Sequence, residues 1–153
     1  MITGQTRLAA LIGKPVRHSL SPALINTAFA EAGLDAVYTV FEVEPGDVER
    51  ALDAVRALGM LGVTVTMPHK QAVFAAVDEL DPAAAALGAV NCVVRRPDST
   101  LLGCNTDGGG LVDSLRLDAG WEPAGQEVVV LGAGGRPAPS SMRWRERAPG
   151  SPS

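Results

Sequence analysis

Short apolar runs alternate with helix-like segments along the first part of this chain of 153 residues. Residues 8–12, 37–41 and 61–66 have the length and the apolar content of buried strands. Between them, residues 23–32 and 48–58 carry apolar side chains at helical spacing, and a glycine follows each segment. Because parallel strands need a crossover connection, this order predicts an α/β fold with a mainly parallel sheet flanked by helices.

The middle of the chain continues with shorter elements. We expect helices at 70–77 and 82–87, strands at 89–95 and 100–104, and a helix at 110–117. Pro97-Asp98-Ser99 separates the two strands and is typical of a hairpin turn. These elements would complete a first domain of residues 1–107, followed by a linker helix and connection at 108–125.

The last part of the chain changes in character. Residues 126–135 predict a strand that runs into the Gly-rich turn Gly132-Ala133-Gly134-Gly135, which is similar to the opening of a dinucleotide-binding βαβ unit. Residues 136–153 are rich in Pro, Ser and Arg and lack the apolar helix that should follow. We therefore expect a truncated Rossmann start and a disordered tail. A strand at 128–131 without a sheet to join would favour aggregation.

Charge and composition exclude several classes of function. The formal net charge is −4, and four of the arginines lie after Gly135, so the preceding part of the chain is strongly acidic and offers no basic surface for nucleic acid. No apolar run is long enough to cross a membrane, and the N-terminus lacks the pattern of a signal peptide. Cys92 and Cys104 have no nearby His or Cys, which predicts free thiols, no metal site and a cytoplasmic location.

Several polar residues fall where the predicted strands end. In open sheets with parallel strands, ligands bind at the carboxyl ends of the strands, which places the Ser19/Ser21 turn and the turn from Thr66 to Lys70 on one rim. Ser21 precedes a proline and is expected to be the N-cap of the first helix. In an extended segment, Ser19 and Ser21 would point to one side and could hold a carboxylate. Thr66 is either ordinary strand filler or a ligand-binding residue.

Lys70 is one of only two lysines in a chain that otherwise uses arginine. An ammonium can pass a proton to and from a hydroxyl, whereas a guanidinium does not release its proton near neutral pH. Asp107 could orient Lys70, although it could equally cap the following helix. Asn91 lies in an apolar segment, where it is either a structural clamp or a ligand to a hydroxylated substrate. We expect His18 and His69 to line the rim without acting as bases.

Four motifs in this order and spacing resemble the shikimate dehydrogenase family. They are Gly13-Lys-Pro-Val-Arg-His-Ser-Leu-Ser-Pro22, Val63-Thr-Val-Thr-Met-Pro-His-Lys70, Gly88-Ala-Val-Asn91 and Asn105-Thr-Asp-Gly108. The resemblance covers residues 1–135. Cys104 departs from the acidic or aromatic residue that is common before Asn-Thr-Asp in the family.

The resemblance implies roles for individual residues. The carboxylate of shikimate would be bound by Ser19 and Ser21, and its ring hydroxyls by Thr66, Asn91 and Asp107. Lys70 would be the acid/base and Asp107 its partner, in the NADP-dependent interconversion of 3-dehydroshikimate and shikimate in chorismate biosynthesis. The cofactor would lie on Gly132, Ala133, Gly134 and Gly135.

The resemblance also bears on the end of the chain. A shift of one nucleotide after the Gly135 codon, in GC-rich codons, would encode Ala-Ala-Arg-Ala-Val-Val-Asp-Ala-Leu-Ala, which is similar to the helix of the family at this point. We infer that residues 136–153 are out of frame, and we expect little or no turnover. The alternatives are a non-catalytic shikimate- or quinate-binding module and a quinate or aminoshikimate dehydrogenase. A homodimer is also left open.

Overall fold

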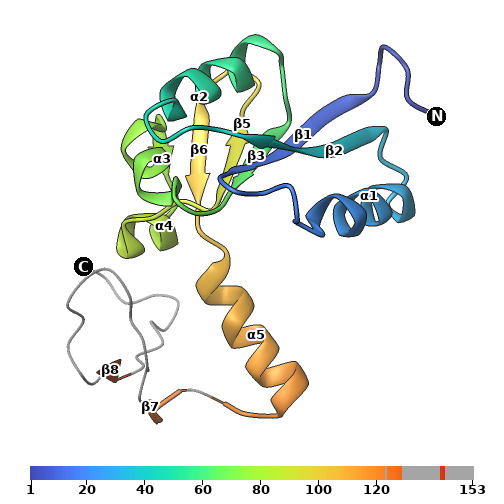
Figure 1. The fold of residues 1–153 in the computed structure, drawn as a ribbon. Coiled ribbons are helices and arrows are strands. Elements are labelled where there is room, and N and C mark those ends of the chain that lie inside the picture. Colours follow the sequence, from blue (N-terminus) through green and yellow to red (C-terminus); the bar gives the residue numbers. More distant parts are fainter. Residues whose placement is uncertain (123, 129–141, 144–153) are drawn as a thin grey trace. The chain divides into compact units, whose positions relative to one another are not determined.

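The computed structural model describes residues 1–122, 124–128 and 142–143 (Figure 1). The chain divides into two compact units, Met1–Asp107 and Gly108–Ser153. The first unit contains a six-stranded sheet and four helices. Its strands are β1 (Arg7–Gly13), β2 (Ala36–Glu42), β3 (Gly62–Val65), β4 (Glu79–Leu80), β5 (Cys92–Arg95) and β6 (Leu101–Cys104). Its helices are α1 (Ser21–Glu31), α2 (Val48–Ala57), α3 (Lys70–Ala76) and α4 (Pro82–Leu87).

The sheet has the strand order β2-β1-β3-β5-β6-β4, and three of its five pairings are parallel. Strand β1 lies between β2 and β3, and it is parallel to both, as the crossover helices predict. The β3–β5 and β5–β6 pairings are antiparallel. The tight connection between β5 and β6 confirms the predicted hairpin, and Ser99 in its turn has a φ of 71°.

The alternation of side chains along the strands divides the core between the two faces of the sheet. On one face, Ile12 and Val63 belong to a large cluster with residues of the helices α2, α3 and α4, among them Leu52, Val73 and Ala84. On the other face, α1 packs Ile25 and Phe29 against a smaller cluster that contains Leu11, Val16 and Tyr38. Figure 1 shows α1 beside β1 and β2, and the other three helices grouped together. The sheet is therefore flanked by helices, as predicted.

The structure differs from the sequence predictions in local details. The expected N-cap residue Ser21 is instead the first residue of α1, and Leu20 occupies the cap position without a side-chain cap hydrogen bond. Strand β4 was not predicted, because two residues are too few to show a strand period. Helix α4 begins and ends where the sequence predicts, with Asp81 accepting a hydrogen bond from the backbone N–H of Ala84 at 2.6 Å.

The second unit contains few described elements. Helix α5 (Asp107–Ala119) begins at the last residue of the first unit, and β7 (Glu127–Val128) pairs with β8 (Met142–Arg143) in an antiparallel arrangement. Of the tail that the sequence predicts to be disordered, only β8 is described. The predicted cofactor residues Gly132, Ala133, Gly134 and Gly135 lie outside the described residues. Within the described part of the chain, no helix combines the length and apolar character that crossing a membrane requires.

Candidate active site

The carboxyl ends of β1 and β3 lie side by side, because the two strands are parallel neighbours. Two backbone hydrogen bonds continue this pairing beyond the strands. The N–H of Thr66 donates to the carbonyl oxygen of Ile12, and the N–H of Lys14 donates to that of Met67, both at 3.0 Å. The peptide bonds before Pro15 and Pro68 are cis. The two loops that carry the predicted site residues are therefore in direct contact.

Gly13 is required by this close approach. A Cβ atom at this position would overlap the side-chain methyl of Thr66 and would lie 2.6 Å from a methyl carbon of Val16. The absence of a side chain at Gly13 therefore leaves room for the methyl group of Thr66. The glycine of the first motif is therefore explained by packing at the ends of two adjacent strands.

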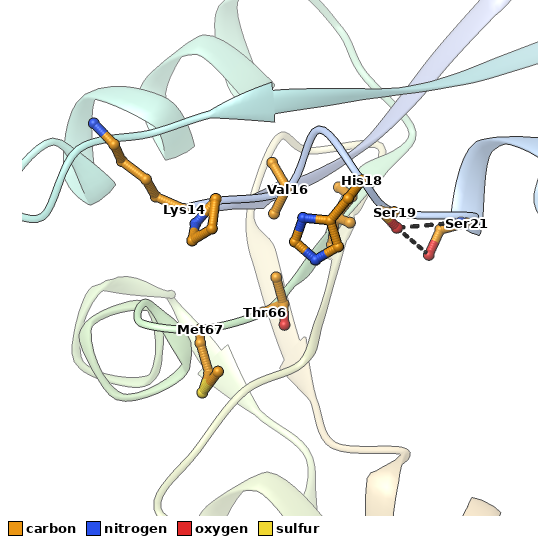
Figure 2. Close-up of a pocket in the computed structure, with 9 residues that line it drawn as sticks. Lys14, Val16, His18, Ser19, Ser21, Thr66 and Met67 are labelled. Carbon is orange, nitrogen blue, oxygen red and sulfur yellow. Dashed lines mark hydrogen bonds between the residues drawn. The ribbon is translucent and has the colours of Figure 1, made fainter.

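A cavity of about 340 Å³ lies where these loops meet (Figure 2). It is lined by Ser19 and Ser21 from the loop and helix after β1, and by Thr66 and Met67 from the turn after β3. The cavity also has a basic residue, Lys14, in its lining, and Lys14 forms an ion pair with Glu44. The volume suits a small ligand, and the hydroxyl groups offer hydrogen bonds to its oxygen atoms.

The two serines are hydrogen-bonded to each other. The Oγ of Ser19 donates to the Oγ of Ser21 at 3.0 Å, and it accepts a hydrogen bond from the backbone N–H of Ser21 at 3.2 Å. The sequence predicts that an extended backbone brings the two hydroxyls to one side. Instead, Leu20 has helical angles, with φ −86° and ψ −4°, so a turn at the start of α1 brings them together.

Lys70 and Asp107 form an ion pair. The Nζ of Lys70 lies 2.6 Å from Oδ2 of Asp107. The two side chains are 32% and 52% exposed, so both can reach a ligand in solvent. A lysine that is held by a carboxylate at this distance can donate a proton to an adjacent oxygen atom and take it back.

The amide of Asn91 holds the other side of the same carboxylate. Its Nδ2 donates to Oδ1 of Asp107 at 2.7 Å and to the hydroxyl of Thr106 at 2.9 Å, and its Oδ1 accepts the backbone N–H of Thr106 at 3.0 Å. Asn105 is 8% exposed. Its side chain accepts a hydrogen bond from the N–H of Asp107 at 3.0 Å and donates one to the carbonyl oxygen of Ala89 at 2.8 Å. Both oxygens of Asp107 are therefore fixed by protein donors.

The two histidines have different environments. His18 lines the cavity, as the sequence predicts. His69 does not lie on the rim. It is only 2% exposed, and its Nε2 lies 2.9 Å from the carbonyl oxygen of Val43. The prediction for His69 is wrong because this residue, at the N-cap position of α3, turns towards the loop after β2.

The predicted site residues thus fall into two groups. Ser19, Ser21 and Thr66 line the cavity, and Lys70, Asn91 and Asp107 form a hydrogen-bonded cluster. The turn from Thr66 to Lys70 contributes one residue to each group, and the N–H of His69 closes this turn on the carbonyl oxygen of Thr66 at 3.0 Å. The described residues contain no group of three or more His, Cys, Asp or Glu side chains that could hold a metal ion.

Sequence reasoning missed the supporting residues Asn105 and Thr106. Their backbone and side chains position Asp107 and Asn91, although neither residue was singled out for this role. Asn105 could have been identified, because a polar side chain at the end of a buried strand needs hydrogen-bond partners.

Comparison with known proteins gives a consistent result. A family model described as the shikimate dehydrogenase substrate binding domain matches residues 11–93. Shikimate dehydrogenase (NADP(+)) of Moorella thermoacetica is 50% identical over 134 residues, which are 88% of this chain and 45% of that protein. The corresponding protein of Rubrobacter xylanophilus is 46% identical in an alignment 159 positions long, which covers 97% of this chain and 56% of that protein.

A solved structure is similar over the same region. The crystal structure of shikimate 5-dehydrogenase from Listeria monocytogenes in complex with shikimate and NAD has a TM-score of 0.82 and 44% sequence identity. The similarity covers 88% of this chain and 46% of that chain. The chain therefore spans about half the length of the proteins that it matches.

Proposed function

Since the chain belongs to the shikimate dehydrogenase family, we propose that its first unit binds shikimate and 3-dehydroshikimate and transfers the proton in their NADP-dependent interconversion. The observation that carries this proposal is the cluster of Lys70, Asp107 and Asn91, in which a carboxylate that is fixed on both sides holds an ammonium at 2.6 Å. The hydroxyl-lined cavity beside the Thr66 turn supports it.

The carboxylate of the substrate would lie against Ser19 and Ser21. Ser21 is the acceptor in the hydrogen bond between the two serines, so its own hydrogen can be donated to a ligand oxygen. Hydrogen bonds to a charged acceptor contribute about 1.5–3 kcal/mol each. Thr66 lines the same cavity and would donate to a ring hydroxyl.

Lys70 would act at the reacting oxygen. When 3-dehydroshikimate is reduced, the ammonium gives a proton to the carbonyl oxygen as it becomes a hydroxyl, and in the reverse direction the amine takes the proton back. Asp107 orients the ammonium, and Asn91 holds Asp107 in place. Asn91 and Asp107 would also bind ring hydroxyls of the substrate.

A nicotinamide cofactor supplies or accepts the hydride in this reaction. The glycines 132, 134 and 135 and Ala133 are the residues that the resemblance assigns to it. The proton transfer and the binding of the carboxylate depend on residues of the first unit alone.

Calorimetric titration of the purified chain with shikimate tests the proposal. We expect saturable binding of shikimate. Its methyl ester should bind more weakly, because the ester lacks the anion that the serines bind, and the affinity for quinate should lie between the two. The absence of a binding heat at millimolar shikimate would contradict the proposal. Adding shikimate and NADP+ to the same sample distinguishes an enzyme from a binding module. Formation of NADPH supports the enzyme, and shikimate binding without formation of NADPH supports the module.

A further inference from the structure

Cys92 and Cys104 are directly opposed partners in the antiparallel β5–β6 pair. Both thiols are free, and both residues are half-buried. Opposed residues in neighbouring strands project from the same face of a sheet. The two thiols therefore lie beside each other on one face.

This face is opposite to the larger core. Val93, next to Cys92, is 1% exposed in the large cluster, so Cys92 projects from the other side of the sheet. There it lines an apolar cavity of about 270 Å³, together with Phe29 and Tyr38. A small reagent can reach the thiol through this cavity.

We propose that Cys92 and Cys104 are a dithiol site that a low-molecular-weight disulfide, such as oxidised glutathione, converts to an intramolecular disulfide. Opposed residues in an antiparallel pair have Cα atoms about 4.5–5.5 Å apart, and disulfides join Cα atoms at about 4.4–6.8 Å. The backbone register thus already brings the two residues within range.

The reaction is a pair of thiol–disulfide exchanges. One cysteine thiolate attacks a sulfur of oxidised glutathione, which forms a mixed disulfide and releases one glutathione. The second thiolate attacks the bound cysteine sulfur and releases the second glutathione. The two thiol protons are taken up by the released glutathiones, so two cysteines are oxidised and one disulfide is reduced. Burial raises the pKa of both thiols, which makes the exchange slow.

The cross-link would act on the proposed active site. Cys92 follows Asn91, Cys104 precedes Asn105, and the N–H of Asn91 donates to the carbonyl oxygen of Cys104 at 3.0 Å. Opposed Cβ atoms are about 4.5–5.5 Å apart, whereas a disulfide holds them at about 3.5–4.5 Å, so closure draws the strand ends together by about 1 Å. The hydrogen bond between Asn91 and Asp107 joins the same two segments.

We therefore expect the disulfide to weaken shikimate binding by about ten-fold, since the displacement would misalign a hydrogen bond between the ligand and Asn91 or Asp107, and the loss of one such bond costs about that factor. The expected effect on shikimate binding rests on the proposed function, whereas formation of the disulfide does not. The two parts have separate measurements.

Formation of the disulfide is tested by mass spectrometry of the purified chain. After treatment with oxidised glutathione and denaturation, we expect loss of two hydrogen atoms, no thiol that reacts with an alkylating reagent, and a peptide that links Cys92 to Cys104. Two alkylated thiols, or glutathione retained on the chain without a link, would overturn the proposal. Cys92→Ser and Cys104→Ser should each stop at the mixed disulfide.

The effect on the site is tested by shikimate titration before and after oxidation. The oxidised chain should bind more weakly and recover with dithiothreitol, while the double variant Cys92→Ser/Cys104→Ser should bind like the reduced chain under both conditions. Unchanged affinity in a chain shown to be cross-linked would overturn the coupling. Failure of the reduced chain to bind shikimate would contradict the proposed function instead, and it would leave the mass measurement valid.

Discussion

The Nζ of Lys70 lies 2.6 Å from Oδ2 of Asp107, although 37 positions separate the two residues in the chain. Each residue is the first of a helix, Lys70 of α3 and Asp107 of α5. A carboxylate is stabilised at a helix N-terminus by the helix dipole, whereas a cation is not. Asp107 is therefore compatible with a purely structural role, but the position of Lys70 is not one that helix stability favours. This difference supports a chemical role for Lys70.

Replacing Lys70 tests this role. In a full-length reconstruction that carries a complete cofactor domain, we expect Lys70→Arg to reduce turnover of shikimate and NADP+ by about 10²–10⁴-fold, because the guanidinium does not release a proton near neutral pH. Affinity for shikimate should change far less, since the positive charge is kept. The measurements are NADPH absorbance and calorimetry. Turnover equal to that of the unsubstituted reconstruction would exclude Lys70 as the proton donor.

Removing the hydroxyl of Ser19 should weaken substrate binding. We expect Ser19→Ala to raise the Kd for shikimate by about ten-fold, because the Ser19 hydroxyl donates to Ser21 and thereby leaves the hydrogen of Ser21 directed at the carboxylate. The methyl ester of shikimate should bind this variant and the unmodified chain almost equally. Ser114→Ala is the matched control, since Ser114 bonds to Asp118 within α5. An equal loss for acid and ester would argue against a carboxylate at Ser19.

The fold was predictable where a pattern repeats over several residues. The three parallel strands and their crossover helices follow from apolar runs and helical spacing, and α4 follows from Asp81 and Pro82 at its start. The two-residue β4 is too short to carry a pattern. The burial of His69 depends on a carbonyl group 26 residues away, which local sequence does not reveal.

The candidate site was predictable to a similar extent. The ends of parallel strands place Ser21 and Thr66 on one rim, and the cavity contains both. The clamp that Asn105 and Thr106 form around Asp107 depends on side-chain geometry beyond the strand end. The opposition of Cys92 and Cys104 could have been found, because a hairpin turn centred on Asp98 makes residues that are equally distant from it partners.

The hydroxyl of Tyr38 should stabilise the first unit. Tyr38 is 5% exposed, and its hydroxyl is hydrogen-bonded to that of Thr64. Tyr38→Phe leaves the hydroxyl of Thr64 without this partner, and we expect it to lower the free energy of unfolding by about 1–2 kcal/mol. Chemical denaturation of Tyr38→Phe, Thr64→Val and the double variant measures the coupling. Additive effects of the two substitutions would show that the hydrogen bond does not contribute.

Gly62 should tolerate no side chain. Its φ is +156°, and a Cβ atom would overlap the carbonyl oxygen of Val93 in the neighbouring strand β5. We expect Gly62→Ala to lower the free energy of unfolding by about 3 kcal/mol or more, because backbone rather than a flexible side chain must move. Gly59→Ala is the control: its φ is +62° with open space around it, so it should cost only about 1 kcal/mol. Equal losses would mean that the contact with Val93 is relieved easily.

Asp78 should make stability depend on acid pH. The N–H of Leu101 and then the guanidinium of Arg56 lower the pKa of Asp78 in the folded state. The contribution of Asp78 to the free energy of unfolding is therefore fully present above its unfolded pKa of about 3.9. This contribution is lost as the pH falls through the lower pKa of the folded state. Because the side chain of Asp78 is 41% exposed, we expect it to contribute no more than about 1 kcal/mol to the free energy of unfolding. Denaturation of Asp78→Asn should show a weaker decline below pH of about 4, and identical pH profiles would contradict this.

The turn from Thr66 to Lys70 contributes Thr66 to the lining of the cavity and Lys70 to the ion pair with Asp107. Because Thr66 and Lys70 are only four residues apart and the turn is closed by its own backbone hydrogen bond, their separation is determined by the main chain. Side-chain substitutions at either end can change how tightly a ligand is held without changing the length of ligand that fits. The backbone of this turn thus sets the length of ligand that the pocket accepts. Substitutions of its side chains can change the relative affinities for acids of similar size.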